Sequence, residues 1–82
     1  MIWYPYAQMK TLDAPIKIDH AKGVHLYTED GHDLIDSVSS WWSVIHGYNH
    51  PEINEAISGQ LEKFAHVMMG GLTHEPVQKL SD

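Results

Sequence analysis

The chain is organised around one aromatic and polar stretch, which reads Ser39-Ser40-Trp41-Trp42-Ser43-Val44-Ile45-His46-Gly47-Tyr48-Asn49-His50-Pro51. The stretch follows neither the period of a helix nor that of a strand. Neighbouring residues of a regular strand point to opposite faces, so Trp41 and Trp42 cannot both face one core from such an element. One of the two indoles is therefore expected to face a cleft or an interface, as in a ligand-binding loop. The alternative is that both indoles simply cover a small core.

Antiparallel strands are predicted over residues 16–37, just before the aromatic stretch. Residues 24–28 alternate apolar and polar side chains, as a half-buried strand does. Residues 32–36 are predicted to return as the partner strand of a β-hairpin. The turn between the two ends at Gly31, which suits a positive φ.

Two further features of the N-terminal half are predicted less directly. Residues 16–18 are expected to add a third short strand, with its turn at residues 21–23. Asp33 and Asp36 are expected on a solvated face of the second hairpin strand. Residues 1–15 carry aromatic side chains and two prolines without a usable period, so they are expected to form an extended arm that packs against another surface.

After the aromatic loop of residues 38–50, the pattern changes to that of an amphipathic helix over residues 51–67. Its first turn holds a proline, and its cap is expected to be Asn49 or His50. Apolar side chains repeat at three- and four-residue spacing in this segment, at Ile53, Ala56, Ile57, Leu61 and Phe64. A second helix, which Thr73 is expected to cap, begins an apolar stripe over residues 73–82 and is interpreted as truncated.

Composition limits the class of protein. A chain of 82 residues suits one small domain at most, and a hairpin with one helix has few ways to cover its apolar faces, which indicates part of a domain. The absence of cysteine excludes disulfides and fits a cytoplasmic protein. A net charge of −6 without any arginine argues against nucleic acid as a partner. No apolar run is long enough for a membrane span.

The residues give little support for chemistry by this chain alone. His46 and His50 have the spacing of a helical metal site, but Gly47 and Pro51 argue against a helix there, and no third ligand is evident. We expect no metal, and these histidines are expected to form local hydrogen bonds. Serines near His46 lack the elbow motif and the carboxylate that nucleophilic catalysis needs. The five lysines lie in polar contexts, whereas a Schiff-base lysine needs a desolvated pocket.

Several short motifs occur along the chain in a characteristic order. They are a Trp-x-Pro-Tyr arm at residues 3–6, the hairpin, Ser-Ser-Trp-Trp at 39–42, Ile-His-Gly-Tyr-Asn-His-Pro at 45–51 and Gly-Gly-x-Thr-His at 70–74. In these motifs the chain resembles the biotin-pathway members of the class III pyridoxal-phosphate aminotransferases, over essentially all its length. The resemblance implies an α+β fragment, the N-terminal part of a fold type I pyridoxal-phosphate (PLP) transferase, with an incomplete domain.

The resemblance also implies roles for particular residues. Tyr6 and Trp41 take the positions that line the substrate pocket in that family. Flat aromatic rings suit this work because they can wall a long aliphatic chain. Four further positions border the active site near the dimer interface of the family, namely Gly70, Gly71, Thr73 and His74.

The activity that the resemblance implies is transfer of an amino group from S-adenosylmethionine to 8-amino-7-oxononanoate, with PLP as cofactor, in a homodimer. The family's Schiff-base lysine is expected beyond Asp82, so the chain alone is expected to be inactive and to bind no PLP. The product of a decayed gene or one half of a split enzyme would both fit this expectation. The alternatives from other classes are a non-catalytic partner-binding module and a small histidine-rich metal binder.

Overall fold

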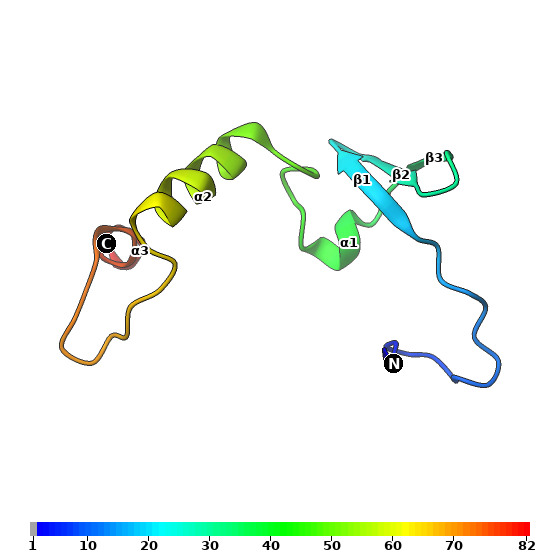
Figure 1. Cartoon of the computed structure of the whole chain (residues 1–82), viewed down its shortest axis with the longest axis horizontal. Coiled ribbons are helices and arrows are strands. Elements are labelled where there is room, and N and C mark those ends of the chain that lie inside the picture. The colour runs from blue at the N-terminus through cyan, green and yellow to red at the C-terminus, as the bar shows by residue number, and fades with distance from the viewer. Residues whose placement is uncertain (1) are drawn as a thin grey trace. The chain divides into compact units, whose positions relative to one another are not determined.

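The computed structural model describes residues 2–82 and contains two compact units, each described here by itself. The first unit ends at His50 and the second begins at Pro51. The elements run in the order β1 (Ile18–Lys22), β2 (His25–Thr28), β3 (Asp33–Ile35), α1 (Ser39–Trp42), α2 (Pro51–Lys63) and α3 (Glu75–Ser81) (Figure 1). The predicted α+β composition, with an antiparallel sheet followed by helices, is confirmed.

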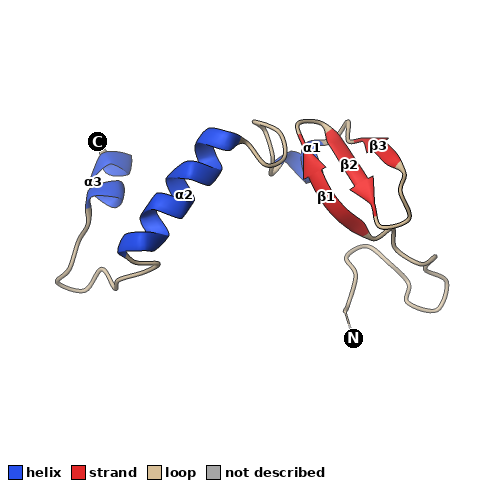
Figure 2. Ribbon diagram, turned by 45° about the horizontal axis from the view of Figure 1, so that its top comes forward, coloured by secondary structure: helices blue, strands red, loops and turns tan. Residues whose placement is uncertain are grey.

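The sheet of the first unit is antiparallel throughout, with strand order β1-β2-β3 (Figure 2). In the central strand, Leu26 pairs with Ala21 on one side and Leu34 on the other. The β2–β3 turn contains Gly31 at φ +91°, a conformation that side-chain-bearing residues rarely adopt. The predicted hairpin is therefore present, and Gly31 has the positive φ expected of it.

The strand predicted at residues 16–18 corresponds to β1, which lies later in the chain than predicted. Residues 16–18 were expected to pair before a turn at residues 21–23, but β1 continues to Lys22, which pairs with His25. This leaves a two-residue loop whose first residue, Gly23, has φ +60°. A loop this tight fixes the register of the hairpin, and that constraint outweighs the β-propensity of the isoleucines before it.

Both helices of the second unit differ from prediction at one end. Helix α2 ends at Lys63 rather than at residue 67, because the side-chain amide of Gln60 donates to the Phe64 carbonyl and closes the last turn. Helix α3 is capped by His74, not by Thr73. The His74 ring nitrogen Nδ1 accepts the backbone N–H of Val77 at 3.4 Å.

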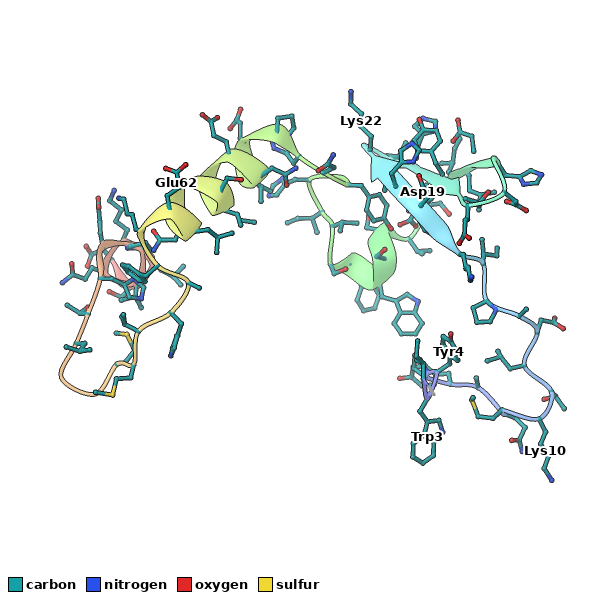
Figure 3. The ribbon with its side chains drawn as sticks, viewed as in Figure 1. Trp3, Tyr4, Lys10, Asp19, Lys22 and Glu62 are labelled. Carbon is teal, nitrogen blue, oxygen red and sulfur yellow. The ribbon has the colours of Figure 1, made fainter. Side chains whose placement is uncertain are left out.

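Hydrophobic burial is slight in both units. Among residues 2–82 no hydrophobic side chain is buried, and Thr28 is the one polar side chain that is. In the N-terminal arm, Trp3 and Lys10 project outward from the chain (Figure 3). None of the helices within residues 2–82 has the length and apolar character needed to cross a membrane. Local order in each unit therefore depends on hydrogen bonds and ring contacts rather than on a packed core.

Candidate functional site

The aromatic loop contains a single left-handed helical turn. Ser39, Ser40, Trp41 and Trp42, which form α1, have φ values of 50°, 45°, 56° and 69°. The left-handed conformation costs an L-residue about 1–2 kcal/mol, and the turn contains no glycine to relieve it. Backbone strain of this kind persists only where surrounding groups enforce it, and such positions cluster at functional sites.

The carboxylate of Asp36, which follows β3, accepts hydrogen bonds from the backbone of this turn. Its Oδ1 accepts the backbone N–H of Val38 at 2.8 Å, and its Oδ2 accepts that of Ser40 at 2.8 Å. The hydroxyl of Tyr48 also donates to Oδ2 and contacts the Ser40 hydroxyl. The Tyr48 hydrogen bond, followed by that from Val38, holds the pKa of Asp36 below its usual value.

The prediction that Asp33 and Asp36 lie on a solvated strand face is wrong for Asp36 and confirmed for Asp33. Asp36 was expected on a solvated strand face, but it lies past the end of β3 and is half-buried against the turn. Asp33 is exposed, as expected, and pairs only at the surface with His25, whose Nδ1 is 2.8 Å from Oδ1. A signal for Asp36 was present in the sequence, because Asp often accepts the N–H two residues further on.

Tyr48 is itself tied to the sheet. Its backbone N–H donates to the Gly23 carbonyl at 2.7 Å, and its carbonyl accepts the Gly23 N–H at 3.0 Å. The neighbouring Gly47 has φ +86°, and a Cβ at that position would lie 3.1 Å from the Gly23 oxygen. This close approach, at a positive φ, favours glycine at position 47. The two backbone hydrogen bonds between Tyr48 and Gly23 join the end of the aromatic loop to the β1–β2 turn.

The structure brings together the two residues predicted to line a substrate pocket. The rings of Tyr6 and Trp41 meet edge to face, with centroids 5.8 Å apart and an interplanar angle of 72°. Together with Val38 and Trp42 they line an open and largely apolar cavity of about 400 Å³, which we term the aromatic hollow. Sequence reasoning did not identify Val38 as a lining residue.

Both tryptophans line this hollow, whereas one of the two was expected to face a cleft or an interface. Trp41 is 63% exposed and Trp42 is 85% exposed, so the alternative in which they cover a core is wrong. The expectation assumed a regular strand with alternating side chains. A left-handed turn follows no such alternation, and adjacent side chains can then border one cavity.

The other four predicted site residues, Gly70, Gly71, Thr73 and His74, belong to the loop between α2 and α3 of the second unit. Gly71 has φ +88° there. The His74 ring lies edge to face with Phe64, at a centroid distance of 5.5 Å, in addition to capping α3. A structural role therefore accounts for His74, and its place at an active-site border, like that of the other three, stays a prediction.

The two histidine rings of the aromatic loop lie edge to face. The rings of His46 and His50 have centroids 6.2 Å apart. The buried Nδ1 of His50 has no hydrogen-bond partner among residues 2–82, which differs from the local hydrogen bonding expected for it. Across that same range, no group of three or more His, Asp or Glu side chains could hold a metal ion.

A covalent link between PLP and this chain would require one of its five lysines. All five are exposed, and Lys22 points away from the sheet at the end of β1 (Figure 3). Lys79 is 2.5 Å from Glu75 on α3, and this ion pair is open to solvent. Because a Schiff-base lysine needs a desolvated site, these residues do not fit the attachment of PLP by themselves.

Comparison with known proteins identifies the family. The sequence model of the family "Aminotransferase class-III" matches residues 6–82. The chain is 51% identical over 79 residues to the adenosylmethionine-8-amino-7-oxononanoate aminotransferase of Buchnera aphidicola subsp. Baizongia pistaciae, covering 96% of this chain and 18% of that protein. It is 46% identical over 80 residues to the protein of that name from Corynebacterium glutamicum, covering 98% of this chain and 18% of the relative.

A solved structure agrees with this assignment. The crystal structure of the protein of the same name from Methanocaldococcus jannaschii superposes with a TM-score of 0.89 at 34% identity, over 98% of this chain and 19% of that one. The chain therefore spans less than a fifth of the length of these relatives. The expected likeness to the N-terminal part of a PLP-dependent transferase is confirmed. The chain belongs to the class III aminotransferases, a family of PLP-dependent enzymes that act on small-molecule substrates.

Proposed function

We propose that this chain forms the substrate-binding wall of an aminotransferase of the biotin pathway. The reaction would transfer an amino group from S-adenosylmethionine to 8-amino-7-oxononanoate and yield 7,8-diaminononanoate. The observation that carries this proposal is the contact of Tyr6 with Trp41 beside the aromatic hollow. The names of the relatives at 46–51% identity support the choice of substrate and amino donor.

The hollow suits a long aliphatic keto acid. Its volume of about 400 Å³ lies within the range of small-molecule sites, and its lining is mostly apolar. Each methylene group removed from water by the rings of Tyr6 and Trp41 would contribute about 0.8 kcal/mol. Apolar walls bind and orient the carbon chain, but they carry no cation to pair with a carboxylate. Because the chain has no arginine, we assign no carboxylate clamp to this hollow.

The chemistry of amino transfer is supplied by PLP when that cofactor is bound to an enzyme of this family. The lysines of this chain do not fit its attachment, so the part proposed for residues 2–82 is binding and orientation of the substrate. Gly70, Gly71, Thr73 and His74 are proposed to take the positions that border the active site near the dimer interface in enzymes of this family.

A chimaera tests the proposal directly. Residues 1–82 replace the matching segment of the Buchnera relative, and formation of 7,8-diaminononanoate is measured with S-adenosylmethionine as donor. We expect product, and we expect Trp41→Ala to raise KM for the keto acid about 10- to 100-fold. Trp3→Ala removes an indole that is 88% exposed and serves as the matched control, with kinetics close to those of the parent. A chimaera that binds PLP but makes no product would contradict the proposal.

A second candidate, a non-catalytic binding module, is favoured by one observation. The apolar stripe of α2 is open to solvent, with Ile53, Ile57 and Leu61 between 43% and 61% exposed. A stand-alone module must fold by itself, so the chain alone should unfold cooperatively when heated and followed by far-UV circular dichroism. A gradual, non-cooperative change in that experiment excludes the module and leaves the aminotransferase segment as the function.

A further inference from the structure

We propose that Asp36 is the positioning residue of the aromatic hollow: it holds the left-handed turn of α1 and so sets Trp41 against Tyr6 for substrate binding. The inference rests on the function proposed above, which uses the two rings but assigns no residue to place them. Asp36 itself does not line the hollow. Its role is to act through the backbone of the turn.

The first support is geometric. Asp36 accepts the N–H of Val38 on one carboxylate oxygen and that of Ser40 on the other, at 2.8 Å each. Val38 immediately precedes the turn and Ser40 lies within it. A single carboxylate therefore binds the backbone at both positions. A carboxylate has acceptor sites only, and hydrogen bonds to an ionised acceptor are the stronger kind. An amide in its place would turn donor hydrogens toward one of these N–H groups.

The second support is that the backbone of the turn is strained. Four consecutive L-residues, none of them glycine, are held at positive φ. Local preference would return them to a right-handed or extended conformation, which would move the Trp41 ring away from Tyr6. Further backbone hydrogen bonds span the turn, from the Trp42 N–H to the Val38 carbonyl and from the Ser43 and Val44 N–H groups to the Ser39 carbonyl. These follow from the turn once it has formed, whereas the Asp36 carboxylate approaches it from outside.

The third support is the anchor behind Asp36. Tyr48 donates its hydroxyl to the same carboxylate, and its backbone is paired with Gly23 at the β1–β2 turn. The Asp36 N–H donates to the Val24 carbonyl at 2.8 Å, which fixes the aspartate to the same turn. A continuous path of hydrogen bonds thus joins the sheet, Asp36 and the turn that carries Trp41.

The structural half of the test uses nuclear magnetic resonance on the 82-residue chain. In the parent we expect cross-relaxation between the Tyr6 and Trp41 rings. Asp36→Asn should abolish it while the amide shifts of Lys22 and His25, which report β1–β2 pairing, stay unchanged. Asp33→Asn is the matched control, since it removes an equal charge from the adjacent strand but frees no backbone N–H of the turn. Persistence of the Tyr6–Trp41 signal in Asp36→Asn overturns the proposal.

The functional half uses the chimaera described above. Asp36→Asn should raise KM for 8-amino-7-oxononanoate roughly tenfold with kcat changed less than about threefold, because a displaced wall weakens binding of ground state and transition state alike. Tyr48→Phe leaves both backbone bonds to Asp36 and should have a smaller effect in the same direction. The absorbance of bound PLP should match that of the parent. Equal KM values for Asp36→Asn and Asp33→Asn overturn the proposal.

The two halves separate this inference from the function on which it rests. If the parent chimaera binds PLP but makes no diaminononanoate, the proposed function is wrong, and the resonance comparison of Asp36→Asn with Asp33→Asn still decides whether Asp36 positions Trp41. If the parent is active and the two variants are indistinguishable in both measurements, the proposed function stands and the inference about Asp36 is wrong.

Discussion

The first unit joins residues that are distant in the chain, whereas the second unit relies chiefly on contacts within one helical turn. Tyr48 bonds both to Gly23 in the β1–β2 turn and to Asp36 after β3. In the second unit, the His74 ring accepts the Val77 N–H, and Glu75 pairs with Lys79 four residues later. The predicted substrate wall lies where the long-range contacts gather.

This difference explains which structure each unit can adopt. The right-handed geometry of α2 and α3 agrees with local backbone preference, so no outside contact is needed to impose their hand. The left-handed turn of α1 runs against local preference at every residue. Asp36 and Tyr48 contact it from outside, and we infer that they position the Trp41 ring relative to the sheet.

The largest effect should come from breaking the long-range tie at Gly47. Gly47→Ala places a Cβ 3.1 Å from the Gly23 oxygen on a residue at φ +86°. We expect it to destabilise the loop by about 2 kcal/mol. Hydrogen exchange at the Tyr48 and Gly23 amides, which form the bridge, should then accelerate. Unchanged exchange at both amides would mean that the bridge does not hold the loop.

A glycine-to-alanine substitution in the second unit should have the opposite effect on stability. Gly59 lies inside α2, and an added Cβ would meet nothing within 4 Å. Gly59→Ala should therefore stabilise the helix by about 1 kcal/mol through propensity alone. The ellipticity at 222 nm of the whole chain should become more negative. A loss of helix signal would show that α2 depends on more than local preference.

The cap of α3 offers a smaller change. His74→Ala removes the acceptor of the Val77 N–H and should cost about 0.5–1 kcal/mol of local helix stability. Thr73→Ala, the control, should have a much smaller effect because Thr73 stands outside the observed cap. Carbon chemical shifts of α3 report the helix population. Equal shifts in the two variants would restore Thr73 as the cap.

Lowering the pH should give the smallest difference between the two units, and it should destabilise both. The pKa of Asp36 is lowered by its hydrogen bonds, from Tyr48 first, and the pKa of Glu75 is lowered by Lys79. A carboxyl group with a lowered pKa stabilises the fold above its unfolded pKa and loses that contribution as pH falls through the folded value. The contributions of Asp36 to the Trp41 resonance and of Glu75 to the α3 shifts should thus stay constant from pH 8 to about pH 5 and be lost in stronger acid.

Salt sharpens this last comparison. The exposed Glu75–Lys79 pair is screened by added ions, whereas the bonds of Asp36 to backbone N–H groups are short and directional. Raising the salt concentration to about 0.5 M should move the acid transition of α3 toward the ordinary pKa of glutamic acid and leave that of Trp41 nearly in place. Equal movement of both would indicate that Asp36 acts by charge alone.

What followed from the sequence by itself was the local part of the structure. The hairpin with a positive φ at Gly31 and the helix starting at Pro51 were both predicted from residue patterns, and the structure confirms them. These features depend on turn chemistry, on periodicity and on motifs that are visible in a few consecutive residues.

Only the tertiary structure decided the hand of the turn at Ser39–Trp42, the role of Asp36 and the register of β1. The physical reason is that each depends on a partner elsewhere in the chain. Nothing in Ser-Ser-Trp-Trp favours a left-handed turn, and an isolated aspartate after a strand is usually solvated. The turn becomes stable only when the sheet brings Tyr48 and the Asp36 carboxylate to the backbone N–H groups that it exposes.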